Sequence, residues 1–242
     1  MNLLVLQHET VEHPGIFRSF LAEDGHTYDA VELQLGEALP SLDCYDALWV
    51  MGGPMDVWQE DAHPWLIAEK AFIREAVVDR GMPYLGLCLG HQLLACALGG
   101  EVGPGTPEIG LMPVTVTESP KSVFAGLPDE VMTLQWHGAE VTALPESAAS
   151  LATSPDCSVQ AMIYGARAVS AQFHLEIEPE TVAAWAQIPE YAAALESALG
   201  AGAVPALEAA AAAQMDALNQ TARRFYNNWM ALAQAGQSAA AE

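Results

Sequence analysis

Short apolar runs alternate with helix-like patterns over the first hundred residues. Strands are predicted at residues 3–6, 30–35, 47–51 and 83–87, and helices between or after them at residues 15–22, 64–80 and 92–98. In the second of these helices, Trp65, Phe72 and Ile73 fall on one side at the helical period. Alternation of this kind predicts an α/β fold, with a mostly parallel central sheet and helices on both of its faces.

The pattern changes after residue 109, where short strands separated by turns are predicted at residues 111–117, 131–135, 149–153, 159–163 and 168–173. Beyond Pro179 the chain becomes helical and rich in alanine. One apolar stripe there steps by three and four residues along Met215, Leu218, Ala222, Phe225, Trp229 and Leu232. We expect the stripe to pack on the protein's own core and residues 235–242 to fray. The predicted organisation is a domain at residues 1–180 and a helical C-terminal extension at residues 181–242 packed on it.

Composition and charge narrow the classes of partner. The 242 residues include 31 acidic and 8 basic ones, a formal net charge of −23, yet only 16% are charged and 52% are hydrophobic. Such a chain can bury a sizeable core, which excludes disorder of the whole chain. The basic residues are scattered, so neither nucleic acid nor a membrane surface is expected as a partner, because phosphate contacts need clustered Lys and Arg.

The cysteines and the N-terminal residues indicate the cellular compartment. Cys44, Cys88, Cys96 and Cys157 form neither a CxxC pair nor a zinc-like spacing. The first residues lack the basic region of a signal peptide, and no apolar run reaches the ~18–20 residues of a membrane span. We therefore expect a cytoplasmic protein with free thiols, no metal site and no cofactor. Any role of a cysteine is then nucleophilic or steric.

Gly86-Leu87-Cys88-Leu89-Gly90 follows a predicted strand and precedes a predicted helix. This is the pattern of a nucleophile elbow with Cys in place of Ser. The residue at the apex occupies a tight, strained turn, so its neighbours two before and two after must be small. Its side chain points above the carboxyl ends of the strands, and the helix N-terminus favours a thiolate. The alternative is a buried core cysteine in a glycine-rich turn.

A nucleophilic cysteine needs a base, and the base needs a group that orients it. Phe173-His174-Leu175-Glu176 ends another predicted strand, and in an extended segment His174 and Glu176 point the same way. His174 would accept the thiol proton and return it to the leaving nitrogen. Glu176 would hold the imidazole tautomer and stabilise the imidazolium. Taken alone, a His-x-Glu pair is more often structural.

Gly52-Gly53-Pro54 closes the third predicted strand near the same edge of the sheet. A Gly-Gly turn lets backbone N–H groups approach a reacting carbonyl, so the N–H groups of Gly53 and Leu89 could form an oxyanion hole. The alternative is an ordinary turn at a strand end. Together with the elbow and the His-x-Glu pair, the turn predicts one acyl-transfer site.

These residues resemble the signatures of the class I, triad-type glutamine amidotransferases. The resemblance covers residues 1–180 and depends on three segments, in order and at the family's spacing: Gly52-Gly53-Pro54, Gly86 to Gln92, and Phe173 to Glu176. It implies a flavodoxin-like, stand-alone member similar to the glutaminase part of GMP synthase. It also implies a triad of Cys88, His174 and Glu176, and a glutamyl group held by Gln92. Trp136 and His137 resemble the family segment that lines the same pocket.

The expected function is cleavage of a γ-glutamyl amide such as glutamine, with release of ammonia or an amine. The chain would serve a separate synthase, or act alone as a γ-glutamyl peptidase or amidase. The family usually has Pro between the His and the Glu, and Leu175 at that position loosens the turn. A catalytically retired binding or regulatory module on the same fold is the alternative, against which an intact triad argues.

Overall fold

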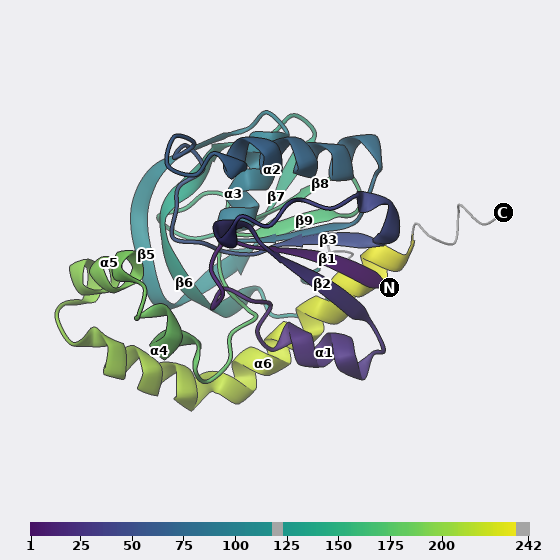
Figure 1. Cartoon of the computed structure of the whole chain (residues 1–242). Helices are drawn as coiled ribbons and strands as arrows, with labels where there is room; N and C mark the ends of the chain where they lie inside the picture. Colours follow the sequence, from purple (N-terminus) through teal and green to yellow (C-terminus); the bar gives the residue numbers. More distant parts are fainter. Residues whose placement is uncertain (118–122, 236–242) are drawn as a thin grey trace.

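A single mixed sheet runs through the computed structural model, which describes residues 1–117 and 123–235 (Figure 1). Its nine strands are β1 Asn2–Gln7, β2 Thr27–Glu32, β3 Ala47–Val50, β4 Tyr84–Leu87, β5 Glu101–Val116, β6 Glu130–Ala143, β7 Ala148–Thr153, β8 Ala161–Tyr164 and β9 Ala168–Ala171. The order across the sheet is β2-β1-β3-β4-β9-β8-β7-β5-β6. Neighbours from β2 to β9 are parallel, and those beyond β9 are antiparallel. The predicted α/β class is confirmed.

Apart from the edge strand β2, which is mostly exposed, the parallel strands are buried on both faces. Leu3 and Val5 of β1 lie in a core with helices α1 (Phe17–Glu23) and α6 (Ala203–Ala235). Leu4 and Leu6 lie in a second core with helices α2 (Trp65–Arg74) and α3 (Leu89–Ala97). Figure 1 shows α1 and α6 on one side of the sheet and α2 and α3 on the other. A continuous apolar run, as opposed to an alternating one, is what this two-sided burial requires.

The C-terminal helices α4 (Thr181–Trp185), α5 (Pro189–Leu199) and α6 extend this framework. Phe225 and Trp229 of the α6 stripe are buried against the sheet, whereas Met215 and Leu218 pack in a third cluster near β5 and β6. The stripe therefore packs on the protein's own core, as predicted, with Leu232 half-buried at its end. Residues 236–242, where fraying was expected, lie outside the described residues, and α6 continues to residue 235. The division at residue 180 stays a prediction.

Three predicted strands differ from the structure. The second strand is Thr27–Glu32 and not 30–35, because its pairing with β1 runs only from Asn2 to Gln7 and leaves residues 33–35 in a 3-10 turn. Strand β5 is far longer than predicted, since Pro and Gly residues before residue 108 are read as breakers of a strand. A register shift between Pro104 and Glu108 accommodates them within the ladder. Strand β6 is longer because its residues 137–143 pair with this part of β5.

Candidate active site

Cys88 lies at a strained turn between β4 and α3. Its backbone angles are φ 50° and ψ −105°, which L residues rarely adopt. A Cβ on Gly86 would lie 2.5 Å from the Gly90 carbonyl oxygen, and one on Gly90 would lie 2.1 Å from the Val50 carbonyl oxygen. Both flanking positions therefore admit only glycine. The Cys88 N–H donates to the Ala171 carbonyl at 2.8 Å, which ties the turn to β9.

His174 and Glu176 lie beside this turn. The His174 Nδ1 is 2.6 Å from the Glu176 Oε1, and both side chains are almost completely buried. A bridge to Leu134, with N···O distances of 2.9 and 3.3 Å, holds the His174 backbone without involving residue 175. Leu175 itself is buried in the sheet core. The structure thus brings together the three residues of the predicted triad.

The electrostatics favour a charged His174. Burial alone would lower the pKa of this imidazole, but the carboxylate of Glu176 and a hydrogen bond with Cys88 outweigh burial and raise the pKa well above its ordinary value. A raised pKa keeps the ring protonated, and an imidazolium stabilises a neighbouring thiolate. The ring also packs edge-on against Trp185, at a centroid distance of 4.5 Å.

The Gly52–Gly53 turn adjoins the elbow directly. The Gly90 N–H donates to the Met51 carbonyl at 3.2 Å, so the two turns are hydrogen-bonded to each other. Gly53 lines the same pocket as Cys88, and Leu89 is the first residue of α3. Among the described residues, neither Gly53 nor Leu89 donates its N–H to another backbone carbonyl. Both donors of the predicted oxyanion hole are therefore available for a ligand.

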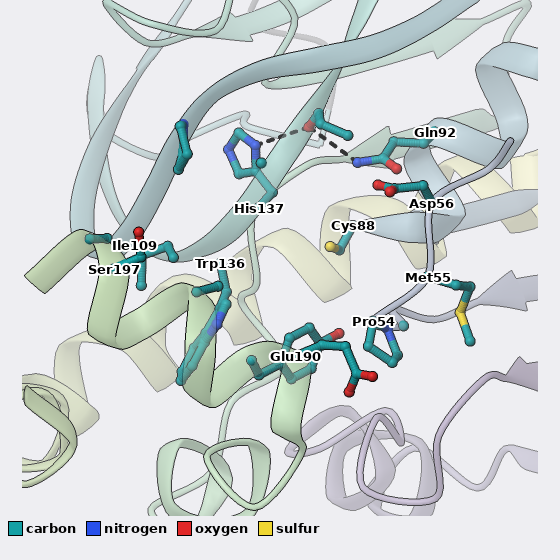
Figure 2. A pocket seen from close by; sticks show the side chains of 17 residues that line it. Pro54, Met55, Asp56, Cys88, Gln92, Ile109, Trp136, His137, Glu190 and Ser197 are labelled. Carbon is teal, nitrogen blue, oxygen red and sulfur yellow. Dashed lines mark hydrogen bonds between the residues drawn. The ribbon is translucent and has the colours of Figure 1, made fainter. Parts of the chain in front are cut away.

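A pocket of about 480 Å³ opens over the thiol, between the Gly53 turn, β6 and α5 (Figure 2). Gln92, Trp136 and His137, the predicted substrate contacts, all line it. The Gln92 Nε2 already donates to the Ala139 carbonyl at 3.2 Å and to the Gln172 Oε1 at 3.0 Å, so only its carbonyl oxygen remains for a substrate. The His137 Nδ1 lies 3.1 Å from the same Ala139 oxygen.

Other residues of the site belong to no recognisable sequence motif. Asp56 and Glu190 line the pocket, and no Lys or Arg is among its lining residues in the described part of the chain. Tyr191 of α5 also lines it and donates its hydroxyl to the buried Glu12. Burial is the main cause that raises the pKa of Glu12. The side chain of Gln172 approaches the Cys88 Sγ at 3.7 Å.

Further features bear on other kinds of site. In residues 1–117 and 123–235, no group of three or more His, Cys, Asp or Glu side chains is placed to hold a metal ion. The four cysteines are free thiols, with Cys44 exposed and Cys157 buried. Over the same part of the chain, no helix has both the length and the apolar character needed to cross a bilayer.

Comparisons with known proteins agree with this geometry. The model of the family described as Glutamine amidotransferase class-I matches residues 22–184. The glutamine amidotransferase-like protein YfeJ of Salmonella typhimurium is 34% identical over 191 residues, which cover 75% of this chain and 78% of that protein. A glutamine-hydrolyzing GMP synthase subunit of Sulfolobus acidocaldarius is 32% identical over 152 residues, 62% of this chain and 77% of that one.

A solved structure extends the likeness to the whole fold. The crystal structure of a glutamine amidotransferase from Thermotoga maritima superposes with a TM-score of 0.85 at 29% identity, covering 95% of this chain and 97% of that chain. The match therefore includes the C-terminal helices as well as the sheet. The chain belongs to the class I glutamine amidotransferase family, whose chemistry in general is hydrolysis of the glutamine amide.

Proposed function

We propose that this protein hydrolyses γ-glutamyl amides, of which glutamine is the simplest, through a triad of Cys88, His174 and Glu176. The observation that supports the proposal most is the buried 2.6 Å contact between His174 and Glu176 beside the strained Cys88 turn. A retired binding module would have no use for that arrangement, since a strained turn and a buried ion pair both cost stability. This argues for an enzyme and against the binding module.

The reaction proceeds in two halves. The Cys88 thiolate attacks the γ-carbonyl carbon, and the N–H groups of Gly53 and Leu89 donate to the oxygen as it becomes negative. The C–N bond then breaks, and the imidazolium of His174 gives its proton to the departing nitrogen. The products of this half are a γ-glutamyl thioester and ammonia or an amine. Water, deprotonated by His174, attacks the thioester, releases glutamate and regenerates the thiol.

The leaving group divides the proposal into two versions. The Sulfolobus acidocaldarius relative is named as one subunit of a GMP synthase, which suggests that this chain also releases ammonia for a separate synthase. In the other version the chain acts alone as a γ-glutamyl peptidase or amidase. Glutamine turnover by the isolated chain at a rate comparable with that of larger γ-glutamyl amides favours the second version. Glutamine turnover that appears only with a synthase favours the first.

The experiment measures glutamate together with ammonia or amine, released from glutamine and from a panel of γ-glutamyl amides. Wild type is compared with Cys88→Ser and with Cys44→Ser, which changes an exposed thiol outside the pocket. We expect turnover by wild type and by Cys44→Ser, and loss of turnover in Cys88→Ser. If wild type cleaves no member of the panel, or if Cys88→Ser retains full turnover, the proposal is wrong.

A further inference from the structure

A second histidine, His8, is hydrogen-bonded to the Gly52–Gly53 turn and is not among the described residues that line the pocket. His8 directly follows β1 and is completely buried. Its Nδ1 lies 2.8 Å from the Gly52 carbonyl oxygen, and its Nε2 lies 2.9 Å from the Glu69 Oε1 of α2. The ring stacks on Trp65 at a centroid distance of 5.4 Å. Three contacts, one from the turn and two from α2, therefore fix the imidazole in one orientation.

The two contacts define what His8 donates. A carbonyl oxygen accepts hydrogen bonds only, so the Nδ1 facing Gly52 carries a proton. A carboxylate oxygen also accepts hydrogen bonds, so the imidazolium form of His8, which its raised pKa favours, donates at both ring nitrogens. Burial would lower the pKa of His8, but Glu69 outweighs this effect and raises it. Glu12 also acts on the ring and favours the cation, and Glu9 interacts electrostatically with His8 as well.

The geometry of a single peptide unit links this contact to the reaction. The Gly52 carbonyl and the Gly53 N–H belong to the same amide, and the described chain contains no cis peptide bond. In a planar trans amide the C=O and N–H bonds point in opposite directions. A carbonyl oxygen held at His8 therefore directs the N–H away from His8, and Gly53 itself lines the pocket.

The Cα atoms of the turn are closely packed by their neighbours. A Cβ on Gly53 would lie 2.8 Å from the His8 Cβ and 2.9 Å from the Leu89 Cδ2. A Cβ on Gly52 would lie 2.3 Å from the Glu12 Oε2 and 3.2 Å from the His174 Cε1. A positive charge at the carbonyl oxygen also polarises the amide and makes its N–H a stronger donor. Both effects act on the N–H that would meet the developing oxyanion.

We propose that His8, neutralised by Glu69, is a positioning residue that aims and polarises the Gly53 N–H of the oxyanion hole through the carbonyl of the same peptide unit. The inference depends on the proposed function, because it assigns a task to an oxyanion donor. His8 itself contacts no reacting atom.

The test compares two reactions of Cys88, one that forms an oxyanion and one that does not. Hydrolysis of a γ-glutamyl amide passes through an oxyanion, whereas alkylation of Cys88 by iodoacetamide displaces iodide and forms none. His8→Gln alone leaves Glu69 as a buried unpaired charge, which destabilises the fold. The double variant His8→Gln/Glu69→Gln removes both charges together and keeps amide groups that can hydrogen-bond. Thermal unfolding verifies that it is folded, and His91→Gln controls for loss of another fully buried imidazole.

We expect kcat of the double variant to fall by about tenfold to a hundredfold, below the ~10²–10³ lost with an entire oxyanion donor. KM and the rate of Cys88 alkylation should stay near those of wild type, and His91→Gln should keep its kcat. If the folded double variant keeps the wild-type kcat, His8 does not act on the oxyanion. The same conclusion follows if the rate of Cys88 alkylation falls by the same factor as kcat. If wild type itself cleaves no γ-glutamyl amide while Cys88 still alkylates, the proposed function has failed instead.

Discussion

One added methyl group at Gly90 should distort the nucleophile turn. In Gly90→Ala the new Cβ would lie 2.1 Å from the Val50 carbonyl oxygen and 3.1 Å from the Val50 Cβ. The first of these distances is shorter than real contacts allow, and the obstacle is backbone of β3, which cannot rotate away. The elbow or the strand must therefore shift, and the Cys88 thiol shifts with the elbow.

The magnitude follows from two opposing effects. Replacing Gly with Ala inside a helix is worth ~1 kcal/mol, and overpacking a buried site costs ~1–3 kcal/mol. Because the clash is with backbone, we take the upper end and expect a net loss of about 2 kcal/mol in the free energy of unfolding. For a chain of this length, that loss lowers Tm by roughly 4–8 °C. A thiol displaced by ~1 Å costs about a hundredfold in kcat.

The assay combines thermal unfolding with γ-glutamyl amide hydrolysis, and Gly103→Ala serves as the matched control. A Cβ at Gly103 would meet nothing closer than the Thr142 Cγ2 at 3.5 Å, an ordinary contact, and Ala is favoured over Gly in a strand by ~0.5–1 kcal/mol. The control should keep its activity and its Tm, or gain slightly in Tm. A Gly90→Ala protein with wild-type Tm and kcat, or a control equally damaged, would refute the reasoning.

Three further predictions concern charge. Glu176→Gln removes the main cause that raises the pKa of His174, so the imidazolium loses its proton at lower pH. The alkaline limb of the pH profile of Cys88 alkylation should therefore move to lower pH. An unmoved limb would contradict the role assigned to Glu176. Burial lowers the pKa of His91 to about 3, so below about pH 6.5 the unfolded chain binds a proton that the folded chain refuses. The free energy of unfolding should then fall with decreasing pH by up to ~1.4 kcal/mol per unit, and less steeply in His91→Gln; equal slopes in denaturant titrations would count against this. Because Asp56 and Glu190 line the pocket, kcat/KM should be about fivefold higher for γ-glutamyl amides whose leaving amine bears an ammonium than for those whose leaving amine bears a carboxylate, which corresponds to a Coulomb energy of ~1 kcal/mol. Asp56→Asn should reduce this ratio of kcat/KM values, and an unchanged ratio would contradict the prediction.

Local patterns predicted the part of the fold that holds the nucleophile. Strands β1 and β3 are continuous apolar runs ended by polar residues or glycine, and both features follow from burial on two faces. The early half of β5 and the late half of β6, which pair with each other, could not be predicted in the same way, because Pro104 and Gly105 oppose a strand locally. Their pairing is a tertiary effect in which a bulge absorbs the irregular residues. Residues 33–35 illustrate the reverse case, in which a strand-like pattern has no partner once β1 ends.

The site also contains residues that local sequence predicts and residues that only tertiary packing brings together. Cys88, His174 and Glu176 could be found because each lies in a short segment whose spacing has a chemical meaning, and the structure brings them together. Glu12 and Tyr191 are 179 residues apart in the chain and meet only through the packing of α5. His8 gave a weak signal, since it is a polar residue directly after a buried parallel strand, where sites of open α/β sheets lie.

The central claim is that Cys88 becomes acylated by the γ-glutamyl group, and one measurement tests it most directly. A diazoketone analogue of glutamine alkylates the thiol that would attack the γ-carbonyl, and intact mass followed by peptide mapping locates the adduct. We predict one adduct per chain, on Cys88, prevented by an excess of glutamine and absent in Cys88→Ala. An adduct on Cys44, Cys96 or Cys157 instead, or no adduct on a protein that still hydrolyses glutamine, would contradict the account.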